Sequence, residues 1–189
     1  MTPTARTIAA SFIVAALLGS AACSHTASSR GDFAPGPVVT RATAAQNAAL
    51  IDRIKSLAGT WESTDEKGVA HISSVYSVSS SGSVVRQIML PGSPHEMTNM
   101  YHMDGPSMVM VHYCAMGNQP HLRATATGST PDRIELKSDG VTNRTAADQP
   151  YMAQLTIIFK DADHIREEWR TYENGSLGSG TNFDLARRK

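Results

Sequence analysis

The sequence has few cysteines, no excess of charge of either sign and no apolar run long enough to cross a membrane as a helix. Its 2 cysteines exclude a scaffold of several disulfide bonds. The 17 basic and 17 acidic residues balance, which argues against nucleic acid or an anionic membrane surface as a partner. Aromatic residues make up 6% of the chain, yet the hydrophobic share of 41% is enough for one folded domain.

The first 23 residues have the pattern of a bacterial export signal. Arg6 precedes an apolar run over 8–18, which is too short to span a bilayer. The tetrad Ser20-Ala21-Ala22-Cys23 resembles a lipobox, in which Cys23 becomes the lipidated N-terminus, and ordinary signal-peptidase cleavage is the alternative. We therefore expect an exported cell-envelope protein. The expected form is an outer-membrane lipoprotein that faces the periplasm, with only its lipid anchor in the membrane, or a secreted protein, and an uncleaved anchor is the remaining alternative.

The segment 24–40 is small, polar and proline-containing, and it predicts a flexible tether ahead of a folded domain over 41–189. This domain begins with one predicted helix. Thr43 and Gln46 have capping-box spacing, and Gly59 is placed to end the helix. Apolar residues recur between these positions at helical intervals, so one face of the helix is expected to be buried.

The remainder of the chain predicts strands, because segments of about six to ten residues alternate with turn signals such as Asp104-Gly105 and Asn174-Gly175. About ten strands are expected, near 60–66, 69–78, 83–90, 96–103, 107–116, 121–127, 132–138, 151–160, 164–173 and 178–187. An open meander of this kind would leave two exposed edges, and closure removes both. The expected fold class is an all-β, antiparallel up-and-down barrel of about ten strands with one N-terminal capping helix.

The segment 164–173 alternates between charged and apolar residues. Its charged face contains His164, Arg166, Glu168 and Arg170, and the opposite face contains Ile165 and Trp169. We expect the charged face to lie in solvent. The alternative, with the charged face inward, would suit an anionic ligand.

The triplet Gly59-Thr60-Trp61, after a short helix and at the start of the first strand, resembles the lipocalin signature of the calycin barrels. The resemblance implies that Trp61 closes one end of the barrel beneath an arginine from the end of the chain, through a cation–π contact. Arg187 is the candidate, with Arg188 as its alternative. Trp61 as an ordinary core residue is the other interpretation.

Further motifs extend this resemblance: PGxxHEM at 91–97, MYHxDG at 100–105 and HYCxxGNQP at 112–120. Together with GTW at 59–61 they are similar to a group of uncharacterised secreted bacterial proteins that are thought to be lipocalin-like. The resemblance implies the fold and the compartment. That group has no settled activity, so no catalytic residue is carried over. Related calycin barrels, the nitrobindins, hold haem, but no haem-ligand motif is found here.

Polar side chains are concentrated in VHYCAMGNQPH at 111–121, which is expected to hold the end of one strand, a corner and the start of the next. We expect a partly apolar small molecule in the barrel, bound without catalysis and oriented by a few polar groups. The candidate ligand-binding residues are His102, His112, Cys114, Asn118, Gln119 and His121. The alternative is that the glycine, asparagine and proline of this corner serve turn geometry alone.

Other chemistries remain open from the residues alone. A transition metal such as Zn or Cu would use His112 and Cys114, two apart on one strand, with His102 or His121 from a neighbouring strand. Haem would take a histidine or the Cys114 thiolate as an axial ligand. A cysteine-dependent enzyme would pair Cys114 with a histidine and Asn118. The haem- or metal-binding barrel is the main alternative to the small-molecule carrier.

Overall fold

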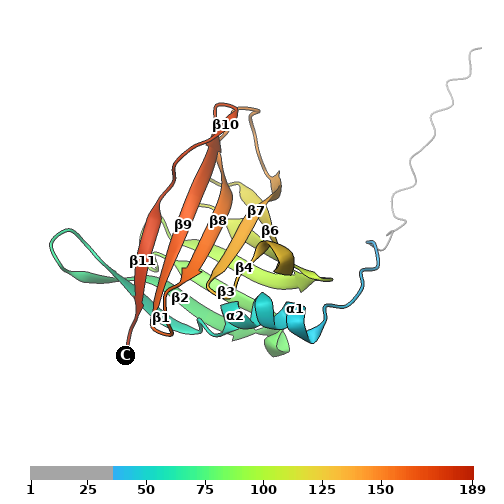
Figure 1. The fold of residues 1–189 in the computed structure, drawn as a ribbon. Helices are drawn as coiled ribbons and strands as arrows, with labels where there is room; N and C mark the ends of the chain where they lie inside the picture. The colour runs from blue at the N-terminus through green and yellow to red at the C-terminus, as the bar shows by residue number, and fades with distance from the viewer. Residues whose placement is uncertain (1–35) are drawn as a thin grey trace, which may run out of the picture. The chain divides into compact units, whose positions relative to one another are not determined.

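Ten antiparallel strands close into a barrel in the computed structural model, which describes residues 36–189 (Figure 1). The predicted export signal, Cys23 and most of the predicted tether lie outside the described residues. The tenth strand is in two pieces, so there are eleven strand elements: β1 (Gly59–Thr64), β2 (Ala70–Ser79), β3 (Val84–Met89), β4 (Met97–Asp104), β5 (Ser107–Tyr113), β6 (Gln119–Thr125), β7 (Arg133–Thr142), β8 (Tyr151–Phe159), β9 (His164–Glu173), β10 (Ser176–Leu177) and β11 (Asn182–Arg187).

Barrel closure depends on β9, which pairs with β8 along one edge and with β11 along the other. β11 then pairs with β1, and each strand from β1 to β8 pairs with the next in sequence. The two-residue strand β10 pairs only with β9, on the edge that β9 also offers to β11. It is therefore the outer part of an interrupted tenth strand. The predicted all-β up-and-down barrel is confirmed, and its ten strands lie close to the predicted segments.

The predicted helix is present as two short pieces, α1 (Ala44–Ala49) and α2 (Ile51–Lys55). The capping box is formed, since the Gln46 amide nitrogen donates to Thr43 Oγ1 at 3.2 Å and Thr43 N donates to Gln46 Oε1 at 2.8 Å. The break falls at Leu50, whose φ of −121° and ψ of −90° are not helical. Among the described residues, no helix has both the length and the apolar character needed to cross a membrane.

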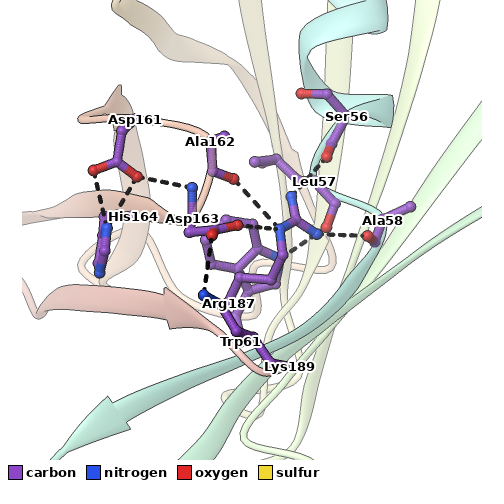
Figure 2. A network of polar contacts seen from close by, with 10 residues as sticks. All are labelled: Ser56, Leu57, Ala58, Trp61, Asp161, Ala162, Asp163, His164, Arg187 and Lys189. Carbon is purple, nitrogen blue, oxygen red and sulfur yellow. Dashed lines mark hydrogen bonds and ion pairs between the residues drawn. The ribbon is translucent and has the colours of Figure 1, made fainter.

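Trp61 and Arg187 meet at the barrel end that the two helices cover (Figures 1 and 2). The Trp61 side chain is fully buried, and its Nε1 donates to Leu57 O at 2.7 Å. Arg187 Cζ lies 4.4 Å from the centroid of the Trp61 ring. Its Nη1 and Nη2 donate to Ala58 O at 2.8 Å and Ser56 O at 2.9 Å. The helix end and the last strand are thus fixed around one indole, and we call this the helix-capped end.

Alternation along the strands decides which side chains enter the barrel. On β9, Ile165, Glu167 and Trp169 are buried, whereas the charged neighbours between and beside them are exposed or half-buried. The charged face of this strand therefore lies outside, as the sequence predicts. The interior is largely apolar toward the helix-capped end, and a set of buried polar side chains crosses its middle: Ser74, Tyr76, Gln87, Asn99, Tyr101, His112 and Glu167.

Candidate functional site

The six predicted ligand residues do not converge on one site. On β4, Asn99 and Tyr101 are buried in the barrel, so His102 points to the outer face. On β6, Leu122 is buried inward, and His121 likewise points outward. His112, on the strand between them, is buried with 1% of its surface exposed. The expectation that both outer histidines line the cavity is therefore corrected, because strand register sends them to the opposite face of the sheet.

The corner that follows β5 is held by its own amides. Asn118 Nδ2 donates to Pro150 O at 2.9 Å, and Asn143 Nδ2 donates to Gly117 O at 2.6 Å. Gln119 Nε2 also donates to Gly117 O, at 3.0 Å. The bonds to Pro150 and from Asn143 join the β5–β6 turn to the β7–β8 loop, and the Gln119 bond lies within the turn. Asn118 and Gln119 thus have structural partners, although Asn118 Oδ1 is buried with no partner among the described residues.

His112 lines a cavity of about 210 Å³ inside the barrel. β11 runs from Phe183, at this cavity, to Arg187, beside Trp61. The cavity therefore lies toward the barrel end opposite the helices, and we call this the cavity end. Apart from His112 the lining is mostly apolar or thioether in character, and it consists of Met89, Leu90, Met97, Met152, Trp169, Thr181 and Phe183.

Glu167 is the centre of a buried polar network next to this cavity. Gln87 Nε2 donates to Glu167 Oε1 at 2.8 Å, and Trp169 Nε1 donates to Glu167 Oε2 at 3.3 Å. The Tyr76 hydroxyl also donates to Oε1. Burial raises the pKa of the Glu167 carboxyl above its ordinary value, and these donors oppose that shift by stabilising the ionised form.

The network continues from Gln87 to the cavity. Asn99 Nδ2 donates to Gln87 Oε1 at 2.7 Å, and the Tyr101 hydroxyl donates to the same oxygen at 2.8 Å. Asn99 Oδ1 lies 2.6 Å from His112 Nδ1. Amide groups from two strands therefore connect the buried carboxyl to the imidazole that lines the cavity.

His112 is held neutral by its surroundings. Burial lowers its pKa to about 4, so the ring is uncharged at neutral pH. It packs against Trp169 with ring centroids 4.9 Å apart and a tilt of 47°. Its Nε2 is buried and has no hydrogen-bond partner among the described residues. A residue that lines an apolar cavity and carries an unpartnered polar atom is a typical attachment point for a ligand.

The structure bears on the three alternative chemistries, which are a metal site, a haem site and a cysteine-dependent active site. Among residues 36–189 no three His, Cys, Asp or Glu side chains are grouped to hold a metal ion, and the outward His102 and His121 explain why the predicted set is not assembled. Haem, with four pyrrole rings, is larger than a cavity of about 210 Å³, so the described residues do not fit it. Cys114 is half-buried at the start of the corner, and no described hydrogen bond joins its thiol to a histidine.

Sequence reasoning missed most of the site, including Glu167, Trp169, Gln87 and Asn99. A signal for Glu167 was present, because it stands between Ile165 and Trp169 and strand alternation places it with them inside the barrel. A carboxylate on an otherwise apolar face is an unusual feature that merits a functional interpretation. Gln87 and Asn99 carry no comparable signal, because polar residues on a half-buried strand are common.

A larger groove of about 330 Å³ lies on the outside of the barrel, over β1, β9 and β11. Its polar side chains already have partners: Lys160 Nζ lies 2.6 Å from Asp184 Oδ1, and His164 Nδ1 lies 2.9 Å from Asp161 Oδ1. We therefore place the candidate site in the smaller internal cavity. Comparison with models of known protein families and with curated proteins found no match for this chain.

Proposed function

We propose that the protein binds a small, largely apolar molecule in the cavity end of its barrel. The observation that carries the proposal is His112, which lines an apolar cavity and whose buried Nε2 has no partner among the described residues. An unsatisfied buried polar atom costs about 1–3 kcal/mol, and a ligand with one matching polar group would recover that energy. Apolar contacts with the lining would supply the rest of the affinity.

The size of the cavity limits the ligand. An apolar cavity of about 150 Å³ accepts benzene, so about 210 Å³ suits a molecule of one or two rings. Met89, Met97 and Met152 give the walls adaptable, polarisable contacts. Trp169 and Phe183 add flat aromatic surface, which favours a planar guest.

Calorimetric titration of the purified protein with indole, benzofuran and naphthalene tests this function. At least one of these probes is expected to bind at one site per chain. Met97→Trp should abolish binding, because the larger side chain fills the cavity. Met103→Trp is the matched control, since Met103 is on the same strand and packs on the core near the helices. Failure of all three probes to bind, or unchanged binding by Met97→Trp, would contradict the proposal.

A soft metal ion is the second candidate, because three methionine thioethers border the same cavity as the unpartnered imidazole nitrogen. Thioether and imidazole ligands suit Cu(I). Competition for Cu(I) against the chelator bathocuproine disulfonate tests this candidate. A protein that takes no Cu(I) from the chelator, or a His112→Gln variant that takes as much as the unaltered chain, would count against it.

The proposed place of action is the bacterial envelope, and the proposed relationship is to lipocalin-like barrels. The support for the first is the N-terminal signal pattern, and for the second the GTW triplet, which stands at the start of β1 in a closed barrel. Metabolic labelling with a fatty acid tests the anchor. Label that persists in a Cys23→Ser variant would exclude lipidation at Cys23.

A further inference from the structure

The hydrogen bonds that begin at Glu167 have a defined direction. Glu167 accepts at both of its carboxyl oxygens, because Trp169 Nε1 donates to Oε2 and the Tyr76 hydroxyl donates to Oε1. Gln87 likewise turns its NH₂ group toward Glu167 and donates to Oε1. The same NH₂ group also donates to Ser74 Oγ at 2.9 Å. The carbonyl of Gln87 therefore faces the other way, where it accepts from Asn99 and from Tyr101.

The direction is passed on to the imidazole. The NH₂ group of Asn99 donates a hydrogen bond to Gln87 Oε1. The carbonyl oxygen Oδ1 of Asn99 therefore faces His112 Nδ1, at 2.6 Å. A carbonyl only accepts, and Nδ1 must therefore carry the proton of the neutral ring. Nε2 is then left as a bare lone pair, and it can accept a hydrogen bond but cannot donate one.

We propose that the cavity selects ligands that carry an N–H or O–H donor on an aromatic body, and that Glu167 is the positioning residue that sets this preference. The inference rests on the small-molecule binding proposed above. His112 Nε2 would accept the donor of the ligand, and the ring would lie against Trp169 and Phe183. A ligand of the same shape that has only an acceptor would place that acceptor against the lone pair of His112 Nε2. Otherwise the ligand acceptor and Nε2 would both lack a hydrogen bond.

Glu167 acts on this site by two routes. It accepts directly from Trp169 Nε1 and so fixes the indole that packs on His112. Through Gln87 and Asn99 it also fixes which imidazole nitrogen carries the proton. The Glu167 carboxyl can therefore set the preference for a ligand with a hydrogen-bond donor without touching the ligand.

Indole and benzofuran form a suitable pair of probes, because they have nearly the same shape and only indole has an N–H donor. In calorimetric titrations of the unaltered protein, indole is expected to bind about tenfold more tightly than benzofuran, the effect of one buried hydrogen bond. Equal affinity for the two would overturn the donor preference and leave the proposed small-molecule binding intact. If neither binds, and no other probe does, both proposals are wrong.

The proton position is tested without a ligand. In ¹⁵N-labelled protein at neutral pH, His112 is expected to show a protonated Nδ1 and a bare Nε2, with the resonances assigned by their loss in His112→Gln. The opposite tautomer would overturn the proposed direction of the network. The tautomer is read on the unaltered chain, and His112→Gln serves only to assign its resonances.

Glu167→Gln tests the positioning role. An amide at 167 can turn its own NH₂ group toward Gln87, which allows the network to reverse and Asn99 to donate to His112 Nδ1. The indole-to-benzofuran preference is then expected to fall from about tenfold toward one, and the imidazole proton is expected to move to Nε2. Glu168→Gln is the matched control, because Glu168 faces outward and pairs with Arg166 at 2.9 Å. An unchanged preference in folded Glu167→Gln, or an equal change in Glu168→Gln, would refute the role of Glu167.

Discussion

The two ends of the barrel are built from the same alternating strands, yet they are filled in different ways. At the helix-capped end, Leu50 and Ile54 are fully buried in the same core cluster as Trp61, and the indole nitrogen is paired with Leu57 O. At the cavity end, space remains between His112, Trp169 and the methionines, and one imidazole nitrogen has no described partner. The helix-capped end contributes stability, whereas the cavity end keeps an unsatisfied group and an unfilled volume.

The difference shows how a small barrel can separate folding from binding. Filling an interior with side chains maximises dispersion contacts, and leaving a void forfeits them. A protein that needs a cavity can place it at one end and make up the stability at the other. Substitutions at each end test whether the two ends are as independent as their contacts indicate.

The largest expected effect comes from the two tryptophans, which test this division directly. Trp61→Ala should lower the free energy of unfolding by about 4 kcal/mol, because it removes a fully buried indole and its bond to Leu57 O. Trp169→Ala should cost less, since Trp169 already borders a void. Urea denaturation followed by circular dichroism gives both values. Equal losses would show that the cavity end is packed as tightly as the helix-capped end.

The second effect is the pH dependence that His112 gives to the cavity end. Its folded-state pKa of about 4 lies below the ordinary value of 6.5, so the unfolded chain binds more protons between these pH values. Stability should therefore fall by about 3 kcal/mol as the pH drops from above 6.5 to below 4. Glu167 gives stability a pH dependence of the opposite sign. Because burial raises the pKa of its carboxyl, its contribution to the free energy of unfolding is lost as the pH rises.

The contribution of His112 is isolated by subtracting the pH–stability curve of His112→Gln, which keeps a donor for Asn99, from that of the unaltered protein. The difference should appear only on the acid side of pH 6.5 and level off below pH 4. A flat difference curve would mean that the imidazole is not held neutral by burial.

The smallest of the three effects concerns Arg187, whose guanidinium joins the helix end to the last strand. Arg187→Lys should cost about 1.5 kcal/mol, because lysine lacks the planar fork that binds two backbone carbonyls over an indole. Arg188→Lys is the matched control, since Arg188 is exposed and pairs with Glu62 at 3.2 Å; it should change stability by less than about 0.5 kcal/mol. Thermal unfolding measures both. If Arg187→Lys also weakened binding of the probe molecule indole at the cavity end, the two ends of the barrel would be coupled.

Much of the fold follows from local patterns. Turn signals and alternation place the ten strands, and the capping box at Thr43 is formed as its spacing predicts. The contact of Trp61 with Arg187 also has the expected geometry. The break at Leu50 was not predicted, because the apolar spacing of the segment fits a continuous helix, whereas Leu50 has non-helical dihedral angles and is fully buried.

The site was harder to predict. His112 was identified, but His102 and His121 were grouped with it, and the register turns both outward. The density of polar groups at 117–119 turned out to serve the corner itself. Glu167 was not predicted as a site residue, although strand alternation places it on the same face as the apolar Ile165 and Trp169.

The sequence by itself determined the strands, the turns and which side chains of one strand share a face, because these depend on neighbours one or two residues away. Only the tertiary structure decided that Glu167 on β9, Gln87 on β3, Asn99 on β4 and His112 on β5 form one hydrogen-bonded network. Such a network depends on which strands lie side by side and in what register. The direction of its hydrogen bonds, and with it the proton position on His112, is a property of the closed barrel that no single strand carries.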